Sequence, residues 1–533
     1  MTIKVSTSGA ATEAVQRHLD ALVDAKFASR LFAKDHTLWG EAAEDESSKR
    51  LGWVEAAEVS APLVPEIAQL RAELNGKGVD RIVLCGMGGS SLAPEVMTRT
   101  AGLPLVVLDS TDPEQLAASV DTDLERTAVV VSSKSGSTLE TDSQRRAFVA
   151  AFTAAGIDPT ERIFIVTDPG SPLEQASKEA GFRVFLADPT VGGRFSAMTA
   201  FGLVPAGLAG LDLDAFLAPV ATVKDDLEAD SPQNPGLVLG AALAGAEPVK
   251  TFIGVVEQGT DIVGFGDWAE QLIAESTGKE GKGLLPVVLH ADAPEVGLPI
   301  PDLQVVRLVA DAAAEPALGD EINVSGSLSE QMLLWEVAVA VAGQILGINP
   351  FDQPDVESAK AAARALLDAT PAPTEPAFTE GDIEVRGSEE LVANQDTVLG
   401  AVEALLAQLP EGGYVAIQAY ADRLGLADLA QIRDAVAHRA RRPVTFGWGP
   451  RFLHSTGQFH KGGPRVGVFL QITTDSETQY AIPDRPFSFG ELIHAQAAGD
   501  ASVLEDHGMP VLRLNLTNAR GGAQQLLGLL GDI

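Results

Sequence analysis

Basic residues and cysteine are both scarce in this sequence. Its 533 residues include 38 lysines and arginines against 74 acidic residues, which gives a net charge of −36. Nucleic acids and anionic membrane surfaces bind positively charged protein surfaces, so this balance argues against both partners. The one cysteine, Cys85, leaves no disulfide within the chain, which is typical of a reducing compartment. A small anionic substrate stays compatible with the charge, because a local pocket can be positive inside an acidic protein.

Long apolar runs are missing as well. The first residues lack the apolar segment of a signal peptide, and no stretch is long and apolar enough to span a bilayer. We therefore expect a cytoplasmic protein without a membrane partner. Hydrophobic residues make up 45% of the chain and charged residues 21%, which is typical of folded globular domains, and the length suggests several of them.

Short apolar strands alternate with helical segments from Asp80 onward. Such alternation predicts an α/β fold, in which helices cover both faces of a parallel sheet. We expect two domains of this kind and a third, smaller α/β domain at the C-terminal end. The expected limits are an N-terminal helical segment (1–76), a first α/β domain (77–230), a second (231–370), a proline-rich linker (371–383) and the third domain (384–533).

One hydroxyl-rich stretch, Val130 to Thr141, reads as a buried strand that turns into a helix. The turn holds Ser133, Lys134, Ser135 and Thr138. Backbone N–H groups and the helix dipole favour an anion at such a helix start, and hydroxyls with a lysine would add donors. The stretch therefore predicts a phosphate site, although an ordinary capped turn would use the same residue types.

Three further clusters follow in the chain. Gly86 to Ser91 form a glycine-rich turn after a strand, without the lysine of a Walker loop or the spacing of a dinucleotide site. Arg194 follows two glycines, and Glu275 opens the run Glu-Ser-Thr-Gly-Lys at a helix end. A carboxylate can move a proton between carbons next to a carbonyl, and a cation can stabilise the enediolate. Taken alone, each of these residues also has an ordinary structural explanation.

Five sequence blocks together carry a family resemblance. GMGGSS, SSKSGSTLET, GGRFSAMTAFG, AESTGK and NPFDQPDVESAK occur between Gly86 and Lys360 in the order found in phosphoglucose isomerases. The last block departs slightly, with Pro-Asp where the family commonly has a small residue before Val-Glu. The C-terminal stretch RFLHSTGQFHKGGP resembles the isomerase half of bacterial fusions with transaldolase. The chain is thus similar to the phosphoglucose isomerase family over most of its first two domains.

The resemblance implies two sugar-isomerase (SIS) domains that interconvert glucose 6-phosphate and fructose 6-phosphate through a cis-enediol, with no metal or cofactor. It implies that Glu275 is the base, that Arg194 steadies the enediolate, and that Lys360 assists ring opening. The binding positions that it implies for phosphate and sugar are Gly89, Ser90, Ser133, Lys134, Ser135, Thr138 and Gln353.

One expected residue is absent. The family usually has a ring-opening histidine between the Glu275 and Lys360 blocks, and the corresponding stretch here, 326–330, has none. The third domain offers His454 and His460, and we favour His454 because Arg451 flanks it. A neutral imidazole near pH 7 suits proton transfer to a ring oxygen. The alternative is that both histidines are structural.

Other interpretations stay open at this point. An isomerase that also accepts mannose 6-phosphate would differ only in pocket details, and a sensing protein could keep the phosphate site without catalysis. A sensor would have no need of a base, an arginine and a lysine together. The sequence leaves monomer and homodimer open: members of the family are commonly dimers, often with the histidine supplied by the neighbouring subunit. If the third domain supplies this group, one chain would suffice.

Overall fold

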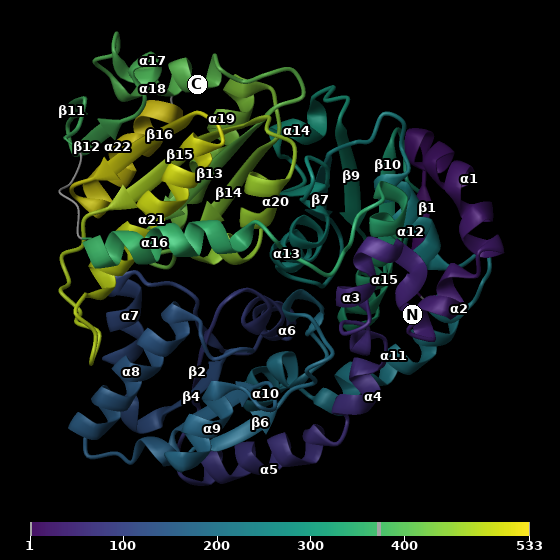
Figure 1. Ribbon diagram of the computed structural model, residues 1–533, viewed down its shortest axis with the longest axis horizontal. Coiled ribbons are helices and arrows are strands. Elements are labelled where there is room, and N and C mark those ends of the chain that lie inside the picture. The colour runs from purple at the N-terminus through teal and green to yellow at the C-terminus, as the bar shows by residue number, and fades with distance from the viewer. Residues whose placement is uncertain (1–2, 370–374, 532–533) are drawn as a thin grey trace.

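Three β-sheets organise the chain (Figure 1). A computed structural model describes residues 3–369 and 375–531. The predicted pair of parallel-sheet domains and the additional C-terminal α/β domain are confirmed by this arrangement. Residues 371–374 of the predicted linker lie outside the described residues. None of the helices formed by the described residues is long and apolar enough to cross a bilayer.

The first sheet is parallel throughout, in the order β3-β2-β4-β5-β6. Its central strands are almost entirely buried, as their runs of valine and isoleucine predict. One face packs against α5 and α10 and the other against α7 and α8. The strands are β2 (Arg81–Gly86), β3 (Val106–Leu108), β4 (Thr127–Ser132), β5 (Ile163–Thr167) and β6 (Arg183–Leu186), and the helices are α5 (Leu63–Gly76), α6 (Leu92–Thr100), α7 (Pro113–Val120), α8 (Leu139–Ala154), α9 (Pro172–Glu179) and α10 (Ala200–Ala209).

The second sheet has the order β1-β10-β9-β7-β8, and all its pairs are parallel except β1 with β10. The sequence predicts only helices before residue 76, yet Lys4–Thr7 forms this added strand. Four residues are too few to show the hydrophobic periodicity of a strand in the sequence. The strand forms because the edge of β10 offers backbone groups for pairing. The strands are β1 (Lys4–Thr7), β7 (Phe252–Glu257), β8 (Leu285–Leu289), β9 (Leu303–Leu308) and β10 (Glu321–Ser325).

Helices from the N-terminal part of the chain and from the second domain surround the second sheet. α15 is almost fully buried, because apolar residues surround it on every side. It packs against α12 and α13, and α1 packs against α12. The helices are α1 (Gly9–Asp24), α2 (Phe27–Phe32), α3 (Glu44–Ser47), α4 (Ala56–Ser60), α11 (Leu213–Glu228), α12 (Pro235–Ala244), α13 (Phe265–Thr277), α14 (Pro294–Gly297) and α15 (Leu328–Leu346).

The third sheet has six strands in the order β11-β12-β16-β15-β13-β14, of which the last four are parallel. α16 leaves the second domain and packs along α21, so both helices lie between this sheet and the first domain (Figure 1). The strands are β11 (Phe378–Glu380), β12 (Ile383–Arg386), β13 (Tyr414–Tyr420), β14 (Val444–Trp448), β15 (Gly467–Thr474) and β16 (Val511–Leu516), and the helices are α16 (Val356–Ala369), α17 (Glu389–Val392), α18 (Val398–Leu406), α19 (Ile432–Ala440), α20 (Gly457–Gly462), α21 (Phe489–Asp506) and α22 (Ala519–Gly531).

Candidate functional site

A half-buried carboxylate and a buried guanidinium face each other between the first two domains. Glu275 lies in the last turn of α13, and Arg194 lies in a short 3₁₀ turn, η7 (Gly193–Phe195). Arg194 Nη1 is 3.6 Å from Glu275 Oε1, and the two side chains are 3% and 13% exposed. Gln271, one helical turn before Glu275, donates from Nε2 to Oε2 at 3.0 Å. Each carboxylate oxygen therefore has its own positive or donor neighbour.

Hydrogen bonds hold Arg194 rigidly. Its Nε donates to Ser276 Oγ at 2.7 Å and its Nη1 to Gln353 Oε1 at 2.8 Å, so two predicted site residues meet here. Its Nη2 donates to the carbonyls of Pro350 and Asp352. Burial lowers the pKa of Arg194 from its ordinary value, yet guanidinium stays charged in proteins. The result is a fixed cation beside the carboxylate.

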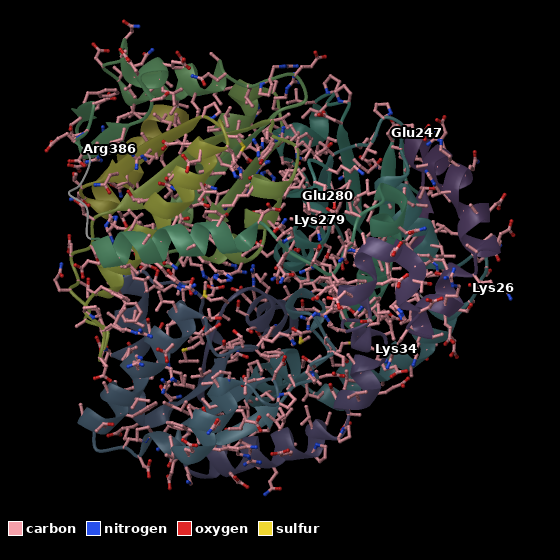
Figure 2. All side chains as sticks on the ribbon, viewed as in Figure 1. Lys26, Lys34, Glu247, Lys279, Glu280 and Arg386 are labelled. Atoms are coloured by element: carbon pink, nitrogen blue, oxygen red, sulfur yellow. The ribbon has the colours of Figure 1, made fainter. Side chains whose placement is uncertain are left out.

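Lys279 also donates hydrogen bonds to the loop at residues 349–353, which accepts hydrogen bonds from Arg194. It is the lysine of the Glu-Ser-Thr-Gly-Lys run and is labelled near the meeting point of the second and third domains in Figure 2. Its Nζ donates to the carbonyls of Asn349 and Asp352, each at 2.6 Å. Burial, with the nearby Arg194 charge, lowers the pKa of Lys279 to about 8. The lysine therefore fixes the loop that carries Gln353.

The glycine-rich turn lies against η7, which carries Arg194, and against α13, which carries Glu275. Gly88 has φ +55°, and a Cβ there would lie 2.7 Å from Gln271 Nε2 and 2.9 Å from the His454 carbonyl oxygen. A Cβ at Gly89 would collide with the carbonyl oxygen of Gly193. The two glycines thus let the turn approach η7, α13 and the third domain at once. Gly89 and Ser90 belong to this turn, η4 (Gly88–Ser90).

Hydroxyls of the serine-rich turn bond to one another. Ser133 Oγ donates to Thr138 Oγ1 at 3.3 Å, and Ser135 and Ser137 share a hydrogen bond of 2.7 Å. Lys134 forms an ion pair with Asp168 and donates to the Val191 carbonyl, and burial lowers its pKa. A cavity of about 450 Å³ borders the turn, with Gly136, Ser137, Arg364 and Arg485 among its lining residues. The turn can thus offer hydroxyl donors to an anion, while Lys134 is already engaged.

His454 comes from the third domain and reaches the first two. Its Nε2 lies 3.1 Å from Glu140 Oε1, and its carbonyl oxygen accepts from Gln271 Nε2 at 2.8 Å. Glu140 is buried in the first turn of α8 and also accepts from Gln496. Burial alone would raise the pKa of Glu140, but His454 and the charge of Lys360 outweigh it and lower the pKa. Glu140 therefore links the two predicted ring-opening residues.

His460 lies elsewhere, inside the third domain. It is 3% exposed, its Nδ1 is 2.8 Å from the Tyr414 hydroxyl, and the two rings stack. Burial lowers the pKa of His460 to about 3, so the ring is neutral at pH 7. Of the two histidines, His454 is the one whose backbone carbonyl accepts from Gln271, the residue that also donates to Glu275.

Sequence reasoning missed three residues of this arrangement: Gln271, Glu140 and Lys279. Gln271 precedes Glu275 by four positions on a helix, and that spacing places two side chains on one face, so a signal was present. Glu140 lies inside the SSKSGSTLET block, but its contact with His454 could not be predicted, because the two residues are 314 positions apart. Within residues 3–369 and 375–531, no group of three or more histidine, cysteine and acidic side chains converges as a metal site requires.

Comparisons with known proteins identify relatives of this chain. The family model described as phosphoglucose isomerase matches residues 69–270. A probable glucose-6-phosphate isomerase of Haloarcula marismortui is 30% identical over 340 residues, which cover 54% of this chain and 78% of that protein. A glucose-6-phosphate isomerase of Thermus thermophilus is 28% identical over 67% of this chain and 96% of its own length. The fold is similar to that of a glucose-6-phosphate isomerase from Chlamydia trachomatis, with a TM-score of 0.54 at 20% identity over 66% of this chain and 86% of that one.

Proposed function

The chain belongs to the phosphoglucose isomerase family and interconverts glucose 6-phosphate and fructose 6-phosphate, and we propose that Glu275 and Arg194 perform its proton transfer. The observation that supports this assignment is the contact of 3.6 Å between the two side chains in a buried site. Burial strengthens their mutual electrostatic interaction and excludes competing water.

In the forward direction, Glu275 removes the proton from C2 of the open-chain aldose. The electrons of that C–H bond form the C1–C2 double bond, and the carbonyl electrons move to O1, which takes up a proton. Arg194 stabilises the negative charge that develops on these oxygens. Glu275 then delivers its proton to C1, and the C2 hydroxyl becomes the ketone by losing its proton, which offsets the proton that O1 took up, so the substrate and product have the same number of protons. No group is oxidised or reduced by the protein, so no cofactor is consumed.

The phosphate is proposed to bind the serine-rich turn. Ser133 and Thr138 would exchange their mutual hydrogen bond, and Ser135 its bond to Ser137, for bonds to phosphate oxygens, assisted by the helix dipole of α8. Gly89 and Ser90 would contact the sugar from the adjacent turn. Lys134 acts on this site as a nearby charge that stays paired with Asp168.

Ring opening is assigned to His454 with Lys360. The imidazole donates a proton to the ring oxygen O5 as the bond between O5 and the anomeric carbon breaks, and it takes up the proton that the anomeric hydroxyl loses, so the histidine ends in its starting state. Glu140 holds the histidine from the first domain. His460 is proposed to be structural, because it is buried against Tyr414.

The base assignment is tested with Glu275→Gln. We expect loss of solvent-deuterium exchange at C2 by a factor of about 10² to 10⁴, the usual contribution of a general base. Binding of a phosphorylated aldonate that mimics the enediolate should persist. The matched control is Glu280→Gln, an exposed glutamate in the following loop (Figure 2), which should exchange normally. Exchange at the normal rate in Glu275→Gln would refute the assignment.

The ring-opening assignment is tested with two substrates. Fructose 6-phosphate must open, whereas 5-deoxyfructose 6-phosphate lacks the hydroxyl that closes the ring and is always open. We expect His454→Asn to lower kcat/KM for the first by about 10²-fold or more and to leave the second within a few-fold. His460→Asn should not change the ratio of the two values. An unchanged ratio in His454→Asn would remove this role from His454.

Location, assembly and domain limits are further parts of the proposal. We place the enzyme in the cytoplasm because a single buried cysteine suits a reducing compartment. The homodimer stays a prediction, to be measured by sedimentation equilibrium. The domain limits at 77–230, 231–370 and 384–533 stay a prediction that limited proteolysis can test, and β1 adds residues 4–7 to the sheet of the second domain.

A further inference from the structure

Two arginines of the third domain enter an acidic site on the first domain. Arg423 follows β13, and Arg451 follows β14. Arg451 Nη1 lies 2.6 Å from Glu95 Oε2 and 3.0 Å from Asp109 Oδ2. Arg423 contacts the same two carboxylates, through Nη1 to Glu95 at 3.0 Å and through Nε to Asp109 at 3.2 Å. Two arginines therefore pair with two carboxylates at the domain boundary, and we call these four side chains the charge cluster.

The charge cluster is shielded from water. The exposed fractions of its four side chains are 14% for Arg423, 11% for Arg451, 10% for Glu95 and 0% for Asp109. Burial alone would raise the pKa of Glu95, but the charges of Arg451 and Arg423 outweigh it and lower the pKa to about 2. Buried pairs of this kind are costly to break, because the remaining partner is left unpaired. The cluster thus fixes the position of Arg451 on the first domain.

Arg451 is also the first residue of the one-turn 3₁₀ helix that ends at His454, η9 (Arg451–His454). Side chains three positions apart in such a helix lie nearly one above the other. Arg451 and His454 therefore leave the turn on one side, toward the first domain. Arg451 Nη2 is also 3.7 Å from Asp267 on α13, the helix that carries Glu275. Fixing Arg451 sets both the direction and the depth of the histidine.

We propose that Arg451 is a positioning residue that places His454 in the sugar site. The inference rests on the proposed ring-opening role of His454. It gives the third domain a defined part in the reaction, which is to hold the ring-opening group against the first two domains. Arg423 shares the same carboxylates but belongs to another loop, so its contribution is to domain docking alone.

The test compares Arg451→Gln with Arg423→Gln. In Arg451→Gln, we expect kcat/KM for fructose 6-phosphate to fall by about 10-fold to 10²-fold, since a shift of roughly 1 Å can cost that much. The value for 5-deoxyfructose 6-phosphate should stay within about three-fold, and Arg451→Lys should restore part of the loss. Arg423→Gln should lower the unfolding temperature without changing the ratio between substrates. Equal ratios in the two glutamine variants would overturn the proposal.

Two further measurements keep the test decisive. If Arg451→Gln does not fold, the pair Glu95→Gln with Arg451→Gln removes one charge of each sign, and the same substrate ratio is measured. Retention of the wild-type ratio in this folded pair would also overturn the proposal. His454→Asn separates the two levels of the argument. If its ratio is unchanged, the ring-opening assignment fails, and if only the Arg451 variants leave the ratio unchanged, the positioning role alone fails.

Discussion

The closest backbone contact of the site predicts a large effect from adding one methyl group. In Gly89→Ala the new Cβ would lie within 3.0 Å of the Gly193 carbonyl, a separation that real Cβ atoms essentially never show. Ordinary contact begins at 3.4 Å, so the backbone at Gly193 must retreat by an amount on the order of 1 Å. Arg194 follows directly, and its guanidinium would move with the backbone. We expect a stability loss of about 1–3 kcal/mol from overpacking and a fall in kcat of about 10²-fold from the misplaced cation.

The matched control lies across the same contact. A Cβ added at Gly193 itself meets no atom within 4 Å, so Gly193→Ala should keep its activity and gain a few tenths of a kcal/mol or more. Urea unfolding measures the stability of both variants, and turnover of 5-deoxyfructose 6-phosphate measures proton transfer without ring opening. If Gly89→Ala retains the kcat of Gly193→Ala on this substrate, the reasoning from the collision is wrong.

Three further predictions concern charge and hydrogen bonding. Glu95 has a lowered pKa in the folded state, so the stability it contributes is present above the unfolded pKa near 4.5 and is lost as the pH falls toward 2. Thermal unfolding should show that Glu95→Gln is less stable than wild type at pH 7. The difference in stability should become smaller as the pH falls from about 4.5 toward 2. A difference that does not change with pH would contradict the lowered pKa of Glu95. Tyr414→Phe should cost about 1 kcal/mol, because His460 Nδ1 loses its partner, with kcat unchanged in a steady-state assay. Arg194→Lys should lower kcat by about 10²-fold to 10³-fold while an aldonate inhibitor still binds, and a normal kcat would exclude Arg194 from stabilising the enediolate.

Much of the fold follows from local sequence. The strands of the first sheet are short runs of β-branched residues between glycine, serine and aspartate. Each face of the sheet is covered by helices whose apolar residues recur at helical spacing. The helix Leu328–Leu346 is built mostly from apolar residues. Its apolar residues on all sides identify it as buried. Strand β1 could not be predicted, because its four residues acquire their structure only through pairing with β10.

The candidate site divides in the same way. Glu275 and Arg194 were named from ordered sequence blocks, and Gln271 could have been found from its helical spacing to Glu275. The choice between His454 and His460 depended on contacts that no local pattern encodes. Tyr414 contacts His460 inside the third domain, whereas Glu140 of the first domain contacts His454. Both partners lie far away in the sequence, so only the tertiary structure separates the two.

The first strand also bears on the order in which the chain folds. Ser8, just after β1, donates to the carbonyl of Glu321, 313 residues later. All the strands of the first sheet lie between these two points, so that domain can fold while β1 still lacks its partner. Closing so long a loop has a high entropic cost, which slows the pairing of β1 with β10. This cost falls once the intervening segment is compact. We therefore expect β1 to be among the last strands to pair, so that the second sheet is completed after the first domain has folded.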